Sequence, residues 1–358
     1  MVMKTKFLLG ALALSSALTA TACKKSEKEA PKPPPATTTT TTPPTTATAP
    51  DAGAVDEVAA RRAKVAERLA KLDADVAKEA ARWTPELEAK VVALRDAPYK
   101  SVDEALTAML ASEHRHPNHP PRDAYRHPRE TLGFFGLTPD MHVIELGSGT
   151  GWYTELLAPI LAKRGSLTVV GPDPEGPDDQ MSIVYGRRLV KLLAKSPALY
   201  GAVKRVAITP PDRLTLGEPG SADMVIAFRE MHNWVGAKAH AAYLAAIFAV
   251  LKDGGTFALI DHRAKPDATV EATVESGYLP EAWVIEQVKA AGFELAAQSE
   301  INANPKDTKD YEKGVWTLPP ALTLGDVDRD KYVAIGESDR MTLKFVKRAA
   351  GAAPAATK

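Results

Sequence analysis

The residues best suited to chemistry form a glycine-rich segment near the middle of the chain. It reads Glu145-Leu146-Gly147-Ser148-Gly149-Thr150-Gly151, after an apolar run at 141–144 and before a helical pattern that starts at 152. Glycines accept positive φ and let backbone N–H groups approach a ligand, and a helix N-terminus behind them favours electron-rich groups. A strand, a glycine loop and a helix in this order predict a nucleotide-type binding loop. Such turns are common in α/β proteins, so the loop alone does not identify the ligand.

The spacing of the glycines narrows the choice of ligand. A dinucleotide fingerprint, Gly-x-Gly-x-x-Gly, counted from Gly147, requires a third glycine where Trp152 stands, and an indole is too bulky for close approach of a pyrophosphate. The remaining pattern, acid-x-Gly-x-Gly-x-Gly, resembles the first motif of the class I S-adenosylmethionine-dependent methyltransferases. In that family the acid that matches Glu145 lies near the methionine end of the cofactor, and the glycines pass under its ribose and methionine portions. The resemblance implies S-adenosylmethionine as the cofactor.

The elements that must position this loop alternate along the chain. Apolar runs predict strands at 141–146, 167–170, 203–208, 222–228, 256–260, 293–301 and 341–346, with helices at 153–163, 238–251 and 280–291 and a helix stop at 253–255. This alternation predicts a doubly wound α/β fold with a mainly parallel seven-stranded sheet. No clear helix separates the last two strands, which indicates an antiparallel last strand that carries a long insertion. The class I methyltransferase fold has that ending, and an ordinary Rossmann domain lacks it.

Five further segments narrow the resemblance. They are 125–128, 151–155, 231–234, 261–263 and 301–307. With the order of elements over about 137–347, they resemble a group of bacterial exported predicted methyltransferases of unknown substrate. The resemblance therefore implies a reaction class and names no acceptor.

Ligands of such sheets bind beyond the carboxyl ends of the strands, so polar residues just after each strand are candidates for the cofactor site. After the second strand, Asp173 is the candidate for accepting hydrogen bonds from the ribose hydroxyls; Glu175 and a merely solvated acidic loop are the alternatives. Arg229 follows the fourth strand. The candidates for cofactor binding are Glu145, Gly147, Ser148, Gly149, Gly151, Trp152, Asp173 and Arg229.

The catalytic candidates follow the fourth and fifth strands. His232 is a candidate general base because imidazole titrates near neutral pH, and His262 offers a second base. Asn233 is a candidate for orienting an acceptor or capping the next helix, Trp234 for stacking on an adenine or acceptor, and Tyr125 for assisting the base. Methyl transfer from a sulfonium is an in-line displacement, so only an acceptor that loses a proton needs a base. In the plainer alternative, His232 and Asn233 only satisfy backbone groups of a loop.

The segment 114–128 holds four histidines and four prolines and is predicted to be free of helix. Metal binding is the competing hypothesis for such a segment. The prolines keep the histidines from sharing one helical face, so no metal is expected. Pro128 then begins a helix that Gly136 ends.

The N-terminal residues predict export. Residues 1–23 have two lysines, a short apolar core and Leu18-Thr19-Ala20-Thr21-Ala22-Cys23, which resembles a lipobox with lipidation at Cys23. Residues 24–50 form a proline- and threonine-rich tether predicted to be disordered. The expected location is the cell envelope, lipid-anchored on the periplasmic face of the inner or outer membrane, or secreted if the lipobox is not used.

The remaining segments complete the predicted organisation. Residues 51–113 form a helical stalk or accessory segment, in which an amphipathic helix at 56–82 is a candidate for self-association and Thr84 and Ser101 cap two further helices. Residues 114–348 form the methyltransferase domain, and 349–358 a disordered tail.

The net charge and the predicted location limit the functions that are possible. The 358 residues carry no formal net charge, and no basic stripe is visible, so no nucleic-acid partner is expected. The sequence predicts a methyltransferase that acts on oxygen or nitrogen of a small-molecule acceptor. S-adenosylmethionine is made in the cytoplasm, which conflicts with export. The alternative is an envelope lipoprotein that binds a small ligand without catalysis.

Overall fold

The computed structural model describes residues 52–348. The signal segment, Cys23, the tether at 24–50 and the tail at 349–358 lie outside the described residues, as does residue 51. None of the helices within 52–348 combines the length and the apolar character that a membrane span requires.

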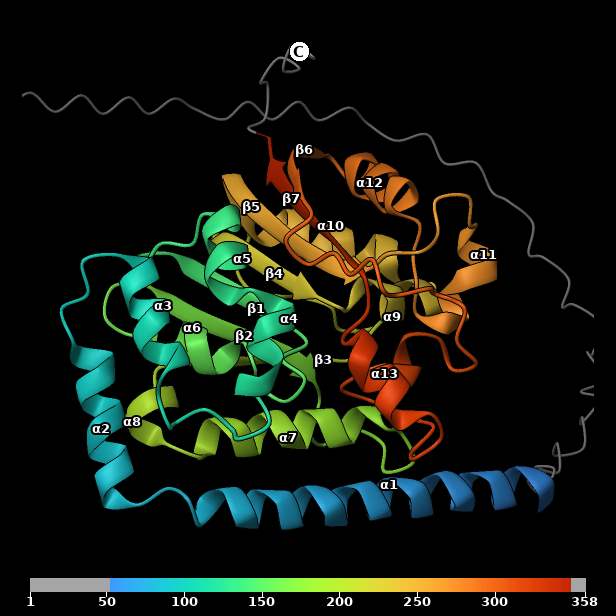
Figure 1. The fold of residues 1–358 in the computed structure, drawn as a ribbon, viewed down its shortest axis with the longest axis horizontal. Helices are drawn as coiled ribbons and strands as arrows, with labels where there is room; N and C mark the ends of the chain where they lie inside the picture. Colours follow the sequence, from blue (N-terminus) through green and yellow to red (C-terminus); the bar gives the residue numbers. More distant parts are fainter. Residues whose placement is uncertain (1–51, 349–358) are drawn as a thin grey trace, which may run out of the picture. The chain divides into compact units, whose positions relative to one another are not determined.

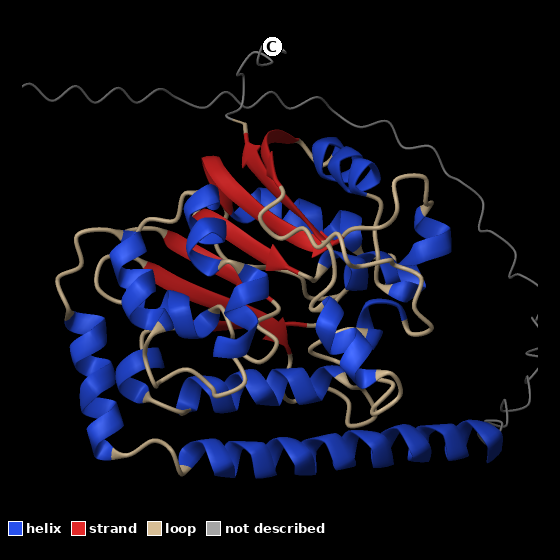
Figure 2. Ribbon diagram, in the orientation of Figure 1, coloured by secondary structure: helices blue, strands red, loops and turns tan. Residues whose placement is uncertain are grey.

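A seven-stranded sheet runs through the fold in the order β3-β2-β1-β4-β5-β7-β6 (Figures 1 and 2). Its strands are β1 (His142–Leu146), β2 (Ser166–Pro172), β3 (Lys204–Ile208), β4 (Ala222–Phe228), β5 (Leu251–His262), β6 (Phe293–Ser299) and β7 (Arg340–Lys347). The first five are parallel, whereas β7 is antiparallel to both of its neighbours, β5 and β6. The predicted fold class is confirmed: this strand order, with its reversed last strand, is that of the class I methyltransferase fold.

Helices cover both faces of the sheet. Before and within the first parallel unit they are α1 (Ala52–Ala80), α2 (Pro85–Asp96), α3 (Val102–Leu110), η1 (Pro120–Arg122), α4 (Asp123–Arg126), α5 (Pro128–Phe135) and α6 (Thr154–Leu161). The remaining helices are α7 (Ser182–Ala194), α8 (Pro197–Tyr200), α9 (Met231–Gly236), α10 (His240–Val250), α11 (Val270–Thr273), η2 (Val274–Ser276), α12 (Glu281–Ala290), η3 (Gly314–Thr317) and α13 (Arg329–Ile335).

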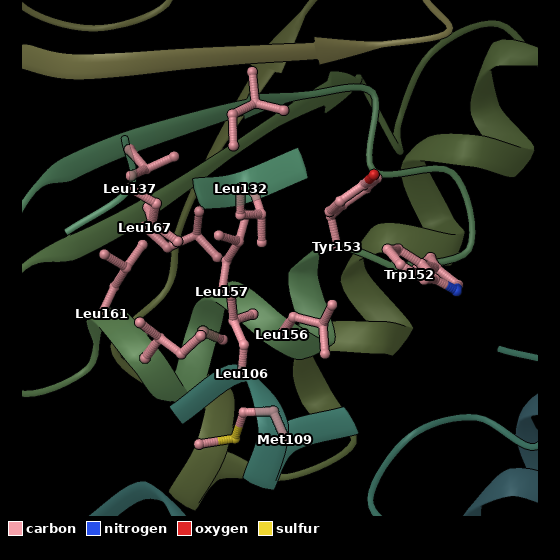
Figure 3. Packing of buried hydrophobic residues seen from close by; sticks show 14 of the residues in the cluster. Leu106, Met109, Leu132, Leu137, Trp152, Tyr153, Leu156, Leu157, Leu161 and Leu167 are labelled. Carbon is pink, nitrogen blue, oxygen red and sulfur yellow. The ribbon is translucent and has the colours of Figure 1, made fainter. Parts of the chain in front are cut away.

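Alternation along the strands sorts the core into two layers. Successive strand side chains point to opposite faces, so Val143 packs in one cluster with α2, α3, α5, α6 and α8, while Ile144 packs in the other with α9, α10 and α12. Figure 3 shows the first layer, where leucines of α6 meet Leu106 and Met109 of α3. β1, β2, β4 and most of β5 are buried on both faces, whereas β3, at the edge of the sheet, is partly exposed. The loop after β1 therefore lies at the carboxyl end of the buried part of the sheet.

The amphipathic stripe of α1 packs against α7. Val65 and Leu72 are buried against Ile183 and Val184, and Arg62 forms an ion pair with Asp178 at 2.9 Å. Part of the stripe predicted for self-association therefore lies on the protein's own α7. Self-association itself stays a prediction.

The predicted helix starts are confirmed where the capping chemistry is local. Thr84 accepts a hydrogen bond from the N–H of Leu87, and Ser101 accepts one from Glu104. Pro128 begins α5 and Gly136, at φ 80°, ends it.

Two local predictions were wrong. The segment 114–128 is not free of helix, because Pro120 begins η1, which continues into α4. Residues 253–255 do not form a turn between α10 and β5, because β5 already begins at Leu251 and contains all three residues. Gly254 takes φ 78° inside the strand, and the register with β4 shifts there. A bulge of this kind requires a residue that accepts positive φ. A tight turn has the same requirement, which is why the Gly-Gly pair also predicts a helix stop.

Candidate active site

The loop between β1 and α6 has the backbone that its glycines predicted. Gly147, Gly149 and Gly151 all have positive φ, at 68°, 58° and 86°. A Cβ at Gly147 would stand 2.2 Å from the carboxyl carbon of Glu230, whereas a Cβ at Gly149 would meet no heavy atom within 4 Å. The loop is therefore closed on one side by Glu230 and open at Gly149.

Two adjacent cavities lie at the carboxyl ends of the strands, on either side of this loop. The larger, of about 280 Å³, is lined by Gly147 and by residues that follow β2, β3 and β4, among them Asp173, Ile208 and Trp234. The smaller, of about 60 Å³, is lined by residues of the loop and by Arg126, Glu145, Arg229 and Glu230. Leu146, Gly147 and Glu230 line both, so the two cavities meet at the start of the loop.

The structure brings the predicted cofactor residues to these cavities. Glu145, Gly147, Ser148, Gly149, Trp152 and Arg229 line the smaller one, and Asp173 lines the larger. Gly151 lies behind the loop, where a Cβ would stand 2.3 Å from a methyl group of Leu192. Asp173 pairs with Arg213 and accepts the N–H of Glu175, so its carboxylate is already engaged.

Two acids face the cavities in a partly neutral state. Burial raises the pKa of Glu145 to about 7, opposed by the hydroxyl of Thr154, which donates to the carboxylate at 2.7 Å. Burial likewise raises the pKa of Glu230 to about 8. Near neutral pH each carboxyl is therefore at least partly protonated, and a cation bound beside it would favour the ionised form.

His232 and Asp261 form a buried pair at the ends of neighbouring strands. The Nδ1–H of His232 donates to Asp261 at 2.8 Å, which leaves Nε2 with a free lone pair. The N–H groups of His232 and His262 also donate to this carboxylate, at 3.1 and 2.7 Å. The side chain of Asp261 is thereby fixed, and it fixes the ring of His232 in turn.

In this pair, each side chain stabilises the charged form of the other. Burial disfavours the charged imidazolium of His232, but the carboxylate of Asp261 outweighs burial and raises the pKa of His232. Burial would also raise the pKa of Asp261, yet His232 and the amide of His262 lower it overall. By contrast, burial lowers the pKa of His262 well below its ordinary value, so His262 is neutral beside the pair.

The same three side chains are spaced for a metal. His232, Asp261 and His262 each place one ligand atom within 4.8 Å of the other two. However, the hydrogen bonds to His232 and to the backbone occupy both oxygens of Asp261, an arrangement that suits proton transfer. The absence of a metal stays a prediction.

The insertion between β6 and β7 reaches this pair. The ring of Trp316, in η3, lies 6.1 Å from that of His232 and is 38% exposed. Neither cavity is lined by His232 itself, but Glu230, two residues before it, lines both. His232 is therefore not part of either cavity wall, and its ring lies beside that of Trp316.

Of the other candidates, Asn233 and Trp234 follow His232 in α9, whereas Tyr125 lies beside the insertion between β6 and β7. Asn233 is exposed on α9, and Trp234 stacks on Tyr243 with ring centroids 4.4 Å apart. The ring of Tyr125 packs beside Gly336, in the insertion, and its carbonyl accepts a hydrogen bond from Arg340. Of the predicted residues, the structure joins His232 to His262 directly.

The histidine-rich segment has a structural role beside the loop. His119 is hydrogen-bonded through Nδ1 to Glu155 at 2.7 Å and through Nε2 to the hydroxyl of Thr150 at 3.1 Å. His114 contacts the carbonyl of Glu155 at 2.9 Å. These buried contacts clamp the segment onto the start of α6 and hold the glycine loop from the outside.

The residue-by-residue interpretation missed several groups at the site. Glu230 and Arg126 were not site candidates although both line the smaller cavity, and Asp261 was not identified as the partner of His232. Glu230 carried a usable signal, because it stands only two residues after the end of β4. Arg126 belongs to the segment 125–128 of the resemblance, but its place at the site carried no signal, since only the fold brings residues before β1 to the glycine loop.

Comparisons with known proteins find likeness in structure only. No family model matches the chain, and no curated protein matches it. A S-adenosylmethionine-dependent methyltransferase from Aquifex aeolicus is 16% identical, with 63% of this chain and 92% of that chain covered and a TM-score of 0.41. One from Methanosarcina mazei is 13% identical, with 61% and 98% covered and a TM-score of 0.41.

A third solved structure holds a ligand. The 1,6-didemethyltoxoflavin-N1-methyltransferase of Burkholderia thailandensis, with bound 1,6-didemethyltoxoflavin and S-adenosylhomocysteine, is 18% identical, with 71% and 93% covered and a TM-score of 0.38. Similarity at this level carries no conclusion about the reaction of this chain.

Proposed function

We propose that this protein is an S-adenosylmethionine-dependent methyltransferase that acts on an oxygen or nitrogen of a small-molecule acceptor. The observation that carries the proposal is the open glycine loop after β1, set between two adjacent cavities at the switch point of the sheet. Ligands of open α/β sheets bind at this place. The narrower likeness to exported bacterial methyltransferases belongs to the same proposal and rests on the sequence segments alone.

The residues present fit such a cofactor in two ways. The larger cavity has the apolar and aromatic walls that a nucleoside requires, including Ile208, Trp234 and Tyr243. The smaller cavity places two acids and two arginines around the free space beside Gly149. Asp173 would contact the ribose only after exchanging its bond with Arg213, so it is a weaker candidate than the sequence indicated.

The cofactor supplies an electrophilic methyl group on a sulfonium. Because its thioether leaves without a proton, the protein's task is to align the acceptor and to remove the acceptor's proton. Nε2 of His232 is the available base, and Asp261 stabilises the imidazolium that forms. Trp316 shields this point from one side.

The proposed location is the cell envelope, with a lipid at Cys23 as anchor. It is supported by the sequence of residues 1–50, which lie outside the described part of the chain. At that location the donor would have to reach the domain from the cytoplasm. A protein that binds the donor or its product without turnover is therefore the second candidate.

Calorimetry with the full chain tests the proposal. S-adenosylmethionine and S-adenosylhomocysteine are expected to bind with dissociation constants below about 1 mM, the usual upper range for enzyme substrates. NAD serves as the control ligand, because Trp152 stands where a dinucleotide needs a glycine. If neither sulfur compound binds at millimolar concentration, the proposal is wrong. Binding without transfer of labelled methyl groups to any envelope or small-molecule extract would favour the second candidate.

A further inference from the structure

Four arginines gather around a single acid beside the smaller cavity. Glu337 accepts hydrogen bonds from Arg122 at 2.7 Å, from Arg126 at 3.3 Å and from Arg340 at 3.0 Å, and it is 3% exposed. Arg229 belongs to the same group, because its charge also contributes to lowering the pKa of Glu337. We call Arg122, Arg126, Arg229 and Arg340 the arginine cluster. Three of its four guanidinium groups bind the carboxylate of Glu337, and the fourth, that of Arg229, does not.

The cluster has donors without acceptors. Nη2 of Arg122, Nη2 of Arg126 and Nε of Arg340 are buried and have no hydrogen-bond partner among residues 52–348. A buried charged group that lacks a partner costs free energy. Burial, and then repulsion by Arg229, lower the pKa of Arg126 to about 10. The cluster as it stands is short of negative charge.

Two members of the cluster face the free space at the glycine loop. Arg126 and Arg229 both line the smaller cavity, together with Ser148 and Gly149. The guanidinium of Arg126 lies 4.8 Å from the centroid of the Trp152 ring. Unlike the other three arginines, which pair with Glu337, Arg229 forms no ion pair among residues 52–348. Arg229 also has φ 63°, a conformation that costs energy for a residue with a side chain.

The two acids of this cavity do not neutralise the arginines. Burial raises the pKa of Glu145 to about 7 and that of Glu230 to about 8, and neither carboxyl forms an ion pair with Arg126 or Arg229 among residues 52–348. The other carboxylate close to the segment that carries Arg126, that of Asp123, is paired with Arg115 at 2.6 Å. The deficit of negative charge therefore persists at the cavity wall.

We infer that Arg126 and Arg229 form a binding site for a carboxylate or phosphate group of a bound substrate. A guanidinium fork matches either anion with two parallel hydrogen bonds, and the rest of the cluster supplies the field. The identity of the substrate rests on the proposed function, whereas the anion site itself does not. Two molecules share this chemistry: the donor, through its amino-acid carboxylate, and an acidic acceptor.

The test compares three variants of the full chain by calorimetry. Arg229→Gln removes the charge, Arg229→Lys keeps the charge without the fork, and Arg68→Gln is the control, an exposed arginine of α1. The probes are inorganic phosphate, S-adenosylhomocysteine and 5′-methylthioadenosine, which lacks the amino-acid part. Thermal melting first confirms that each variant is folded.

We expect the wild type and Arg68→Gln to bind phosphate, Arg229→Gln to bind it at least tenfold more weakly, and Arg229→Lys to lie between them. If Arg229→Gln also weakens S-adenosylhomocysteine tenfold and leaves 5′-methylthioadenosine unchanged, the anion is the donor's carboxylate. If phosphate still binds to protein saturated with S-adenosylhomocysteine, the anion belongs to the acceptor.

Equal binding of phosphate and S-adenosylhomocysteine by Arg229→Gln and Arg68→Gln would overturn the inference. Phosphate binding that depends on Arg229 in a protein that binds neither sulfur compound would retain the anion site and reject the proposed cofactor. The two failures are therefore distinguishable.

Discussion

At the scale of single residues, the bond from His232 to Asp261 determines how the site handles a proton. The carboxylate fixes which ring nitrogen carries hydrogen, so Nε2 is the free base. It also makes the protonated ring more stable than it would be in an apolar pocket. A base of this kind works only above its pKa, which lies above the ordinary value for histidine.

The first prediction concerns the pH dependence of this base. The rate of methyl transfer is expected to rise with pH through the raised pKa of His232, since only the neutral ring accepts a proton. Asp261→Asn removes the charge that outweighs burial, so the pKa of His232 should fall below the ordinary value for histidine and the plateau rate should drop about 10²-fold or more. NMR titration of the imidazole ring measures the pKa without an acceptor. Asp267→Asn, an exposed change, is the control.

The hypothesis of a base fails if the pKa of His232 is the same in Asp261→Asn and the wild type. It also fails if replacing His232 and His262 together leaves methylation of a true acceptor unchanged.

Much of the site at this scale could be predicted from residue type and position after a strand. Glu145, the glycines and His232 were found in this way, because local order places them at the carboxyl edge of the sheet. Arg126 could not be found, since it is brought to the cavity by packing of a segment that precedes the first strand. The state of Glu145 was equally hidden, because burial sets its pKa.

At the scale of elements, one side of the glycine loop faces open space and the other side packs against α7. Gly149 and Gly151 have the same kind of backbone, but only Gly149 opens into free volume. A Cβ at Gly149 therefore tests ligand binding, and a Cβ at Gly151 tests the packing of the loop.

Gly149→Ala is expected to cost about 1–2 kcal/mol through its left-handed backbone and to weaken S-adenosylhomocysteine binding. Gly151→Ala should cost a similar amount plus about 1–3 kcal/mol for overlap with Leu192. Denaturant unfolding and calorimetry measure the two effects. Leu192→Ala is expected to recover part of the stability lost in Gly151→Ala and nothing in Gly149→Ala. Unchanged binding in Gly149→Ala would argue against a ligand at the open side of the loop.

The strands and the longer helices could be predicted because each repeats its period over many residues. β4 and α5 were found within a residue of their observed ends. The chain between β2 and β3 was not assigned, although α7 lies there, because its apolar residues are interrupted by basic ones. The helix at Pro120 was missed for another reason, since prolines also begin helices.

At the scale of the whole protein, the proposed location depends on residues 1–50, which precede the described part of the chain. Cys23→Ser is expected to move most of the protein from the membrane fraction to the soluble fraction, because the residue that would carry the lipid is lost. Ser26→Ala, a change of similar size close by, should have no effect. Cell fractionation with detection of the full chain measures both. If Cys23→Ser stays in the membrane fraction, a lipid at this position is not the anchor.

The position of β7 has a consequence for how the protein is made. β7 follows β6 in the chain, yet it lies between β5 and β6 in the sheet. A chain that emerges from the ribosome or an export channel with its amino end first can assemble the five parallel strands, but β6 has no strand to pair with until β7 arrives. The sheet is therefore completed only when β7, the last strand to be synthesised, pairs with β5 and β6. Losing β7 would release β6 as well, so a premature stop codon before Arg340 would remove two strands from the sheet.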